Sequence, residues 1–465
     1  MKQHSVVFAC GICVFVTLFC GKKQPMHTIA VIGTGYVGLV SAACLARFGH
    51  RVTAYDTDAG KIARLQNGEV PFHEPGLQAL ISETTGRGTL SFVQDGKHAI
   101  RERDLVFIAV GTPVGPLGDA DLRFVRQAAH DIARHATGDV VVVNKSTVPV
   151  ETVDLVERVL TREGRPGTRF RVASNPEFFR EGSAVHDFFH PDRIVIGTRD
   201  SECARILREL YQPLNAPVLI VSAHTSEMIK YAANAFLATK ISFVNELANI
   251  CASVGADIEQ VLHGMSYDRR IGRDYMRPGI GFGGSCLPKD LSALAHVARA
   301  HAIEPTMLDA VLQVNRRQIA SILTAIERGH GDLEGARIAV LGLSFKPHTD
   351  DVRASPALEL IEALLARGAD VRVHDPAALS NAHARLGGRV EYAQSPYEAC
   401  AEADVVVIAS AWPEYEQLDW RRVAASVRGT QVFDCVRILP AADVREAGLK
   451  YGAVSTNASD EELSA

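Results

Sequence analysis

A cysteine placed between a glycine-rich loop and an expected helix start is the strongest candidate for chemistry in this chain. Residues 279–290 read Gly-Ile-Gly-Phe-Gly-Gly-Ser-Cys-Leu-Pro-Lys-Asp, with Cys286 just before Pro288, a residue suited to the first turn of a helix. The partial positive charge of a helix N-terminus and the ammonium of Lys289 both favour the nucleophilic thiolate. Asp290 could orient a water or a proton acceptor beside the thiol. Because most cysteines are small buried hydrophobes, this loop alone does not establish catalysis.

A second motif has the spacing of a dinucleotide-binding turn. An apolar run at 29–32 leads into Gly33-Thr-Gly-Tyr-Val-Gly38 and an expected helix near Leu39. In such a turn Gly33 makes the tight bend, Gly35 lets the backbone approach a pyrophosphate, and Gly38 allows close helix packing. The N-terminus of the helix then offers backbone N–H donors to the phosphates.

A carboxylate after the second apolar run indicates which dinucleotide binds. Asp56 follows Gly38 by 18 residues. Its carboxylate would accept both ribose hydroxyls and repel a 2′-phosphate, which predicts NAD rather than NADP. Lys61 is a further candidate contact to the phosphates or adenosine, and a solvated surface lysine is the alternative. Tyr36 and Val37, inside the turn, complete the expected cofactor contacts of this motif.

The elements that must position these motifs alternate between strands and helices. Apolar runs at 29–32, 51–55, 105–110, 140–144 and 171–173 are each followed by a turn and an amphipathic stretch, as in a doubly wound parallel sheet. Strand patterns stop between about 225 and 328, where 227–254 and 291–329 have helical periodicity. They restart with runs at 337–342, 370–374, 404–409 and 431–433.

This alternation predicts an α/β chain with two Rossmann-like doubly wound domains joined by a central all-helical region. The expected divisions are an apolar extension at 1–25, a NAD-binding domain at 26–222, a helical region with the cysteine loop at 223–329, a second Rossmann-like domain at 330–452 and a polar tail at 453–465.

The second α/β unit lacks the three-glycine turn. Its first strand is followed by Gly342-Leu-Ser-Phe-Lys-Pro, which argues against a second dinucleotide. Lys346 and Arg353 lie near an expected helix start, an arrangement that suits a phosphate group. A site for a nucleoside diphosphate is the favoured interpretation, and ordinary surface basic residues are the alternative.

Composition excludes some classes of function. The chain has 465 residues, too many for a single core, with 47% hydrophobic and 22% charged residues, as in soluble globular proteins. A net charge of −5 without a lysine/arginine block argues against a nucleic-acid partner. Nine scattered cysteines without paired spacing favour reduced thiols over a disulfide framework, and no metal site is expected.

The first 25 residues do not fit the pattern of the rest. Residues 6–20 form an apolar run, which falls short of the roughly 20 residues needed to cross a bilayer as a helix. No small-x-small cleavage site follows it. The favoured interpretation is that Met26 is the true start, with a membrane anchor as the alternative. We therefore expect a cytoplasmic protein, with membrane contact only if residues 1–25 belong to it.

Five further motifs are distributed in order along nearly the whole chain. They are Val-Gly-Thr-Pro at 110–113, Lys-Ser-Thr-Val-Pro at 145–149, Asn-Pro-Glu-Phe-Phe-Arg-Glu-Gly at 175–182, Pro-Asp-Arg-Ile-Val-Ile-Gly at 191–197 and Lys-Tyr-Ala-Ala-Asn-Ala-Phe at 230–236. With the turn at 33–38 and the loop at 279–290, they resemble the nucleotide-sugar dehydrogenases, the UDP-glucose/GDP-mannose dehydrogenase family. The resemblance extends from Met26 to about residue 440. It implies two successive NAD-dependent oxidations of a sugar C6 alcohol to a carboxylate, a precursor for polysaccharides.

The resemblance also implies catalytic roles. Cys286 would be the nucleophile that holds the C6 aldehyde, first as a thiohemiacetal and then as a thioester that water cleaves. Lys230 and Asn234 are four residues apart on one expected helix, so both could face the reacting oxygen and stabilise its negative charge. Glu177 would be the general base for hydrolysis. The alternatives are an exposed lysine above a packing asparagine, and a plain loop glutamate.

Other contacts follow from the same resemblance. Thr147 and Asp290 would hold the catalytic water, although Thr147 could instead be a helix cap. Tyr275, where the family often has phenylalanine, would stack on uracil, and Arg277 would reach a phosphate. Arg270 would contribute to the neighbouring subunit's site, which implies a homodimer built on the helical middle. The remaining expected cofactor contacts are Thr112, Thr147, Glu181, Lys289 and Arg353, and the remaining expected substrate contacts are Phe178, Phe179, Gly279, Gly283, Phe345 and Lys346.

Three short runs bear on which sugar nucleotide binds. Glu-Gly-Ser at 181–183, Pro-Asp-Arg at 191–193 and Arg-Ile-Gly at 270–272 resemble the UDP-glucose branch of the family. UDP-glucose is therefore the expected substrate, and GDP-mannose is the alternative. A non-catalytic protein that only binds nucleotide sugars is a further alternative, which predicts the loss of residues such as Cys286 and Lys230 that this chain retains.

Overall fold

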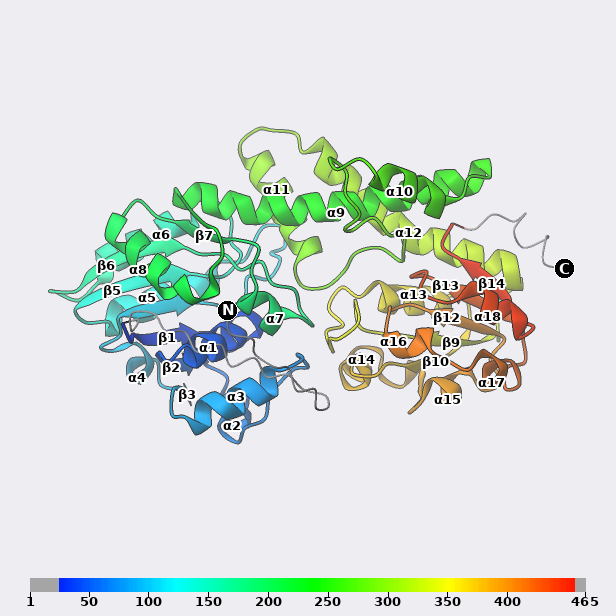
Figure 1. Cartoon of the computed structure of the whole chain (residues 1–465), viewed down its shortest axis with the longest axis horizontal. Coiled ribbons are helices and arrows are strands. Elements are labelled where there is room, and N and C mark those ends of the chain that lie inside the picture. The colour runs from blue at the N-terminus through cyan, green and yellow to red at the C-terminus, as the bar shows by residue number, and fades with distance from the viewer. Residues whose placement is uncertain (1–24, 456–465) are drawn as a thin grey trace, which may run out of the picture.

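The computed structural model describes residues 25–455 as two α/β units connected by a helical middle (Figure 1). The predicted fold class is confirmed. The expected apolar extension at 1–25 and the expected polar tail at 453–465 fall, except for Pro25 and residues 453–455, outside the described residues. Within 25–455, no helix combines the length and the apolar character that crossing a membrane requires.

The first unit is built on an eight-stranded sheet in the order β3-β2-β1-β4-β5-β6-β7-β8. Its strands are β1 (Thr28–Ile32), β2 (Arg51–Tyr55), β3 (Leu90–Val93), β4 (Leu105–Ile108), β5 (Asp139–Asn144), β6 (Arg169–Ser174), β7 (Ile194–Gly197) and β8 (Val218–Val221). Its helices are α1 (Tyr36–Arg47), α2 (Ala59–Gln66), α3 (Leu77–Gly86), α4 (Gly96–Ile100), α5 (Arg123–His135), α6 (Thr152–Glu163), α7 (Ala184–Phe189) and α8 (Ser201–Leu210).

This sheet is parallel except at one junction, where β6 and β7 meet antiparallel through Ser174 and Gly197. The sequence patterns had not predicted β3, β7 or β8, which are four residues each. In β3 the exposed Ser91 interrupts the apolar run. The strand order reverses between β1 and β4. The turn after β1 therefore opens onto the crevice in which sheets of this type bind ligands.

Four helices form the middle region: α9 (Ala223–Val254), α10 (Ile258–Ser266), α11 (Leu287–Ala300) and α12 (Thr306–His330). Ser222 caps the 32-residue helix α9 by accepting a hydrogen bond from the Thr225 N–H. Helix α11 has Cys286 at its N-cap and proline in its first turn, as expected. The stretch from 291 to 329 is mostly helical, as expected: α11 ends at Ala300, and α12 begins directly after Pro305.

The second unit has a six-stranded parallel sheet in the order β11-β10-β9-β12-β13-β14. Its strands are β9 (Arg337–Leu341), β10 (Asp370–His374), β11 (Glu391–Tyr392), β12 (Val405–Ile408), β13 (Gln431–Asp434) and β14 (Lys450–Ala453). Its helices are α13 (Pro356–Leu365), α14 (Leu379–Leu386), α15 (Pro396–Cys400), α16 (Pro413–Glu416), α17 (Trp420–Ala424) and α18 (Ala441–Glu446). Ile322 and Ile326 of α12 belong to the same hydrophobic core as Ile338 and Val340 of β9, which ties the middle region to this unit.

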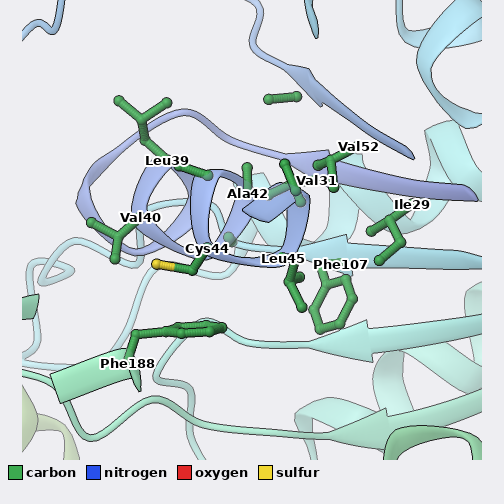
Figure 2. Packing of buried hydrophobic residues seen from close by; sticks show 14 of the residues in the cluster. Ile29, Val31, Leu39, Val40, Ala42, Cys44, Leu45, Val52, Phe107 and Phe188 are labelled. Atoms are coloured by element: carbon green, nitrogen blue, oxygen red, sulfur yellow. The ribbon is translucent and has the colours of Figure 1, made fainter. Parts of the chain in front are cut away.

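Helix α1 is buried along most of its length in the core of the first unit. Figure 2 shows Leu45 directed toward Phe107 of β4 and Cys44 toward Phe188 of α7. Gly38 makes this packing possible, because a Cβ atom there would lie 1.9 Å from the Gly33 carbonyl oxygen. Gly35 differs, since a Cβ atom there would meet no other atom within 4 Å. The turn therefore has no room for a side chain at Gly38, whereas the space beside Gly35 is open.

We expect Gly38→Ala to lower the free energy of unfolding by about 1–3 kcal/mol, because the added methyl group must displace backbone. Gly35→Ala is the matched control: its methyl group enters open space, so the midpoint of thermal unfolding should stay within about 2 °C of the wild-type value. Thermal unfolding followed by circular dichroism measures both. An unchanged midpoint in Gly38→Ala would contradict the close packing at this turn.

Candidate active site

Cys286 occupies the N-cap of α11, at the end of the glycine loop. Of the cysteines between residues 25 and 455, it alone is partly exposed; the others are buried. Burial raises the pKa of its thiol to about 11, with the Lys230 ammonium acting in the opposite direction and three carboxylates adding to the rise. In this structure burial and the nearby carboxylates therefore act against the thiolate that the sequence predicts, and only Lys230 favours it. Activation requires a proton acceptor or a change in the surrounding charge.

A buried ion pair lies beside Cys286. Lys230 of α9 places its Nζ 3.2 Å from Oε1 of Glu177, which follows the end of β6, and both side chains are buried. Burial alone would lower the pKa of Lys230, but Glu177, Cys286 and Asp290 outweigh it and raise that pKa above its ordinary value. The second carboxylate oxygen of Glu177, Oε2, is buried without a hydrogen-bond partner among the described residues. That oxygen is therefore free to receive a proton.

A second set of hydrogen bonds is centred on Asp290, which is fully buried in the first turn of α11. Asn234 Nδ2 donates to Asp290 Oδ2 at 2.6 Å, and Lys289 Nζ lies 2.6 Å from Asp290 Oδ1. Lys289 also donates to Thr112 Oγ1 at 3.2 Å, and that hydroxyl donates to the Thr147 carbonyl at 2.9 Å. The structure thus joins five of the predicted site residues. Lys289 was expected to favour the thiolate, but it pairs with Asp290, and Lys230 is the cation that acts to lower the pKa of the Cys286 thiol.

Glu181 connects all three parts of the chain next to the thiol. Ser285 Oγ donates to Glu181 Oε1 at 2.9 Å, and the same hydroxyl lies 3.6 Å from Cys286 Sγ. Arg353 of the second α/β unit places Nη2 3.7 Å from Glu181 Oε1 while pairing with Asp351 at 2.6 Å. Burial and the nearby Asp351 carboxylate raise the pKa of Glu181 to about 7. The second unit therefore contacts Glu181, and the hydrogen-bond partner of Glu181, Ser285, directly precedes Cys286 in the chain.

The turn after β1 has the features that a bound dinucleotide needs. Gly33 has φ +98°, in the region that favours glycine, and Gly35 leaves open space above the backbone. Asp56 Oδ2 accepts hydrogen bonds from the Thr34 N–H and hydroxyl, both at 2.8 Å, and from Lys61 Nζ at 3.2 Å. These bonds outweigh burial and hold the pKa of Asp56 below its ordinary value. Lys61 therefore lies at this carboxylate.

Two further residues of this turn lie at its other side. The Tyr36 hydroxyl accepts a hydrogen bond from the Gly182 N–H at 2.6 Å, so it anchors the segment that carries Glu181. Val37 is partly buried against the core of the first unit. The donor set around the glycines, with an ionised carboxylate at the end of β2, fits the NAD that the sequence predicts.

The glycine loop is packed against the second unit. A Cβ atom on Gly283 would lie 2.1 Å from the Ala354 carbonyl oxygen, and one on Gly284 would lie 2.6 Å from the Phe345 ring. These glycines therefore allow the 345–354 segment to approach Cys286 closely. Gly279 is held at the other end of the loop, since its N–H donates to Asn245 Oδ1 at 2.8 Å.

Several residues that hold the site were not predicted from the sequence. Asn315 both accepts from the Phe282 N–H and donates to the Phe282 carbonyl, and Gln318 Nε2 donates to the Gly279 carbonyl. Ser285 stands next to Cys286 in the sequence, which was a signal that could have found it. Asn245, Asn315 and Gln318 lie on distant helices and carry no local motif.

The other predicted substrate residues make different contacts. Phe178 stacks with Arg193, whose Cζ is 3.8 Å from the ring centroid, and Lys230 Nζ is 5.3 Å from the same centroid. Phe179 instead packs on the core near Phe188. Lys346 Nζ lies 5.4 Å from the centroid of the Phe345 ring, and burial lowers the pKa of Lys346.

Two predicted residues are not drawn into this cluster. Arg270 is exposed and pairs with Asp268 of its own loop at 2.6 Å, and Arg277 is exposed. Tyr275 differs: it has φ +60° and is 38% exposed, but burial raises the pKa of its hydroxyl, and the charges of Arg180 and Lys230 act on that hydroxyl. Tyr275 therefore lies close enough to Lys230 to interact with it electrostatically.

Comparison with protein families assigns all three parts of the chain. Residues 27–215 match the NAD binding domain of the UDP-glucose/GDP-mannose dehydrogenase family, residues 224–317 match its central domain, and residues 339–441 match its UDP binding domain.

Individual relatives agree with this assignment. The chain is 44% identical over 429 residues to the UDP-glucose 6-dehydrogenase TuaD of Bacillus subtilis, covering 92% of this chain and 93% of that protein. It is also 44% identical over 434 residues to the UDP-glucose 6-dehydrogenase of Rhizobium meliloti, covering 92% and 99%. A UDP-glucose dehydrogenase structure from the archaeon Pyrobaculum islandicum superimposes with a TM-score of 0.88 at 42% identity, covering 94% and 100%. The chain therefore belongs to the UDP-glucose/GDP-mannose dehydrogenase family.

Proposed function

We propose that the protein is a NAD-dependent UDP-glucose 6-dehydrogenase, which oxidises the C6 alcohol of UDP-glucose twice and releases UDP-glucuronate, a polysaccharide precursor. The observation that carries this proposal is the partly exposed Cys286 beside the buried Lys230–Glu177 pair. A thiol that traps an aldehyde, a cation that stabilises an oxyanion and a carboxylate with a free oxygen are what a two-step oxidation to an acid requires. Two relatives that align with 92% of this chain carry this activity in their names.

NAD would bind across the turn after β1, with its pyrophosphate over Gly35 and its ribose at Asp56. When bound it accepts a hydride from the sugar C6 atom in each oxidation. Glu181 would lie between that turn and Cys286, since it accepts a hydrogen bond from Ser285 next to the cysteine and is followed by Gly182, whose N–H donates to Tyr36 of the turn. Lys289 and Thr112, which are hydrogen-bonded to each other, are further proposed cofactor contacts.

In the first oxidation, C6 loses a hydride and its hydroxyl releases a proton to solvent, which leaves an aldehyde. The Lys230 ammonium would stabilise negative charge on that oxygen, with Asn234 beside it on the same helix face. The Cys286 sulfur then bonds to C6, and the thiol proton ends on the oxygen as the thiohemiacetal forms. Because the adduct is covalent, the aldehyde is retained until the second oxidation.

In the second oxidation, the thiohemiacetal loses a hydride from C6 and a proton from oxygen, which leaves a thioester. Water adds to the thioester carbon while Glu177 takes its proton on the free Oε2, and Thr147 and Asp290 would hold that water. The carbon–sulfur bond then breaks, and the sulfur is reprotonated. The acid leaves, and Cys286 returns to the thiol form that its surroundings favour.

The nucleotide end of the substrate would lie between the glycine loop and the second unit. Lys346 and Phe345 lie beside Gly284 there and would contact phosphate and sugar. The match of this unit to a UDP binding domain supports uridine as the base. Tyr275 would stack on that base and Arg277 would reach a phosphate. The protein would act in the cytoplasm, which cell fractionation tests.

We propose further that two copies pair through α9. This helix exposes large apolar side chains at a spacing of seven residues, Phe236, Phe243 and Ile250, which are 65%, 49% and 52% exposed. Such a stripe on a monomer surface indicates a protein contact. Arg270, exposed in the single chain, would then be available to the neighbouring copy's site.

We expect sedimentation velocity to give a dimer for the wild-type protein and a monomer for the double variant Phe236→Lys/Phe243→Lys, because charges would replace the apolar stripe. The matched control is Phe124→Lys, which changes a similarly exposed phenylalanine on α5. A wild-type monomer, or a dimer that survives the double change, would rule out α9 as the interface.

Counting NADH formed per sugar tests the reaction directly. Purified protein with excess NAD should release two NADH per UDP-glucose, because both oxidations occur before the acid leaves. UDP-galactose, GDP-mannose and UDP-N-acetylglucosamine are assayed separately as alternative substrates. Two NADH from GDP-mannose with little turnover of UDP-glucose would instead assign the alternative substrate, and no NADH from any sugar would indicate a non-catalytic binding protein.

A further inference from the structure

A buried lysine, Lys145, lies near Glu177 and takes no part in the proposed reaction. Lys145 follows the end of β5 and is 4% exposed. Its Nζ donates to the Asn175 carbonyl at 3.2 Å and to Asn175 Oδ1 at 3.1 Å. One ammonium therefore fixes both the main chain and the side chain of the same residue. Burial lowers its pKa to about 8, so it remains mostly charged at neutral pH.

Asn175 is the point at which four elements meet. Its Oδ1 also accepts a hydrogen bond from the Tyr211 hydroxyl at 2.6 Å, and its Nδ2 donates to the Val195 carbonyl of β7 at 2.8 Å. The Tyr211 ring lies under the Lys145 ammonium, 5.8 Å from centroid to Nζ. Every polar atom of the Asn175 side chain is thus used inside the protein, and its conformation is fixed.

The backbone leads from this fixed point directly to the proposed base. Pro176, whose ring restricts φ, is the single residue between Asn175 and Glu177. The Lys145 ammonium also interacts electrostatically with both Glu177 and Lys230. The Glu177 carboxylate therefore interacts with two ammonium groups, pairing with Lys230 at 3.2 Å and attracting Lys145 electrostatically.

We propose that Lys145 is a positioning residue for thioester hydrolysis: by clamping Asn175 and adding a second positive charge, it holds the Glu177 carboxylate where it can take a proton from the attacking water. This inference rests on the proposed function. Lys145 touches neither the sugar nor Cys286 in this account, and it acts only through Asn175 and Glu177. Its loss should slow the last step and leave the two hydride transfers comparatively intact.

The test is rapid mixing of Lys145→Met with UDP-glucose and excess NAD, followed by acid quench and mass spectrometry of the Cys286 peptide. We expect a burst of about two NADH per active site, a steady-state rate lower by about 10–100-fold, and an acyl adduct accumulating on Cys286. Lys145→Arg, which keeps the charge and the donors, should accumulate less adduct. Lys97→Met, an exposed lysine on α4, is the matched control and should behave as wild type.

Two results would overturn the inference. One is Lys145→Met without an adduct and with the burst slowed as much as the steady state, which is the signature of a general structural defect. The other is an equal adduct in Lys145→Arg and Lys145→Met. If Lys145→Met does not fold, Lys145→Gln carries the same expectation, since it also lacks the charge. If the wild-type protein forms no NADH, both the proposed function and this inference are wrong. If the wild-type protein turns over normally, the Lys145 variants test this inference alone.

Discussion

The ion pair between Lys230 and Glu177 is the interaction on which the proposed site depends. Two charges at this depth lose much of their hydration, and that loss is offset only while the pair and its neighbours stay together. The pair also joins helix α9 of the middle region to the end of β6 in the first unit. Removing either partner would leave an uncompensated buried charge beside Cys286, so the electrostatics of the thiol and the packing of the two regions are coupled.

The second requirement is that three separate parts of the chain converge on one sulfur atom. Glu181 comes from the first unit, Ser285 from the loop before α11, and Arg353 from the second unit, and all lie within a connected set of contacts. Gly283 and Gly284 permit this, because any side chain there would collide with the 345–354 segment. A site assembled in this way is complete only when the second unit is docked.

Much of this could be predicted from the sequence, because the relevant signals are local. The turn at 33–38, the acidic Asp56 and the position of Cys286 before a helix each depend on a few neighbouring residues. The charge state of Cys286 could not, because it is set by burial and by Glu177, Glu181 and Asp290, which come from different elements. The hydrogen-bond partner of Lys289 could not be predicted either, because the geometry of the first turn of α11 decides it. The antiparallel junction of β6 with β7 likewise depends on contacts between separate segments.

Covalent attachment of the intermediate to Cys286 between the two oxidations is the step on which the proposed reaction depends. The most direct measurement is the NADH yield per UDP-glucose in Cys286→Ser compared with the wild-type protein under identical conditions. Serine keeps the size of the side chain but is a far weaker nucleophile, so the account predicts that the second oxidation is not completed and that the yield falls from two NADH to one or fewer. Two NADH per sugar from Cys286→Ser, at a wild-type rate, would contradict it.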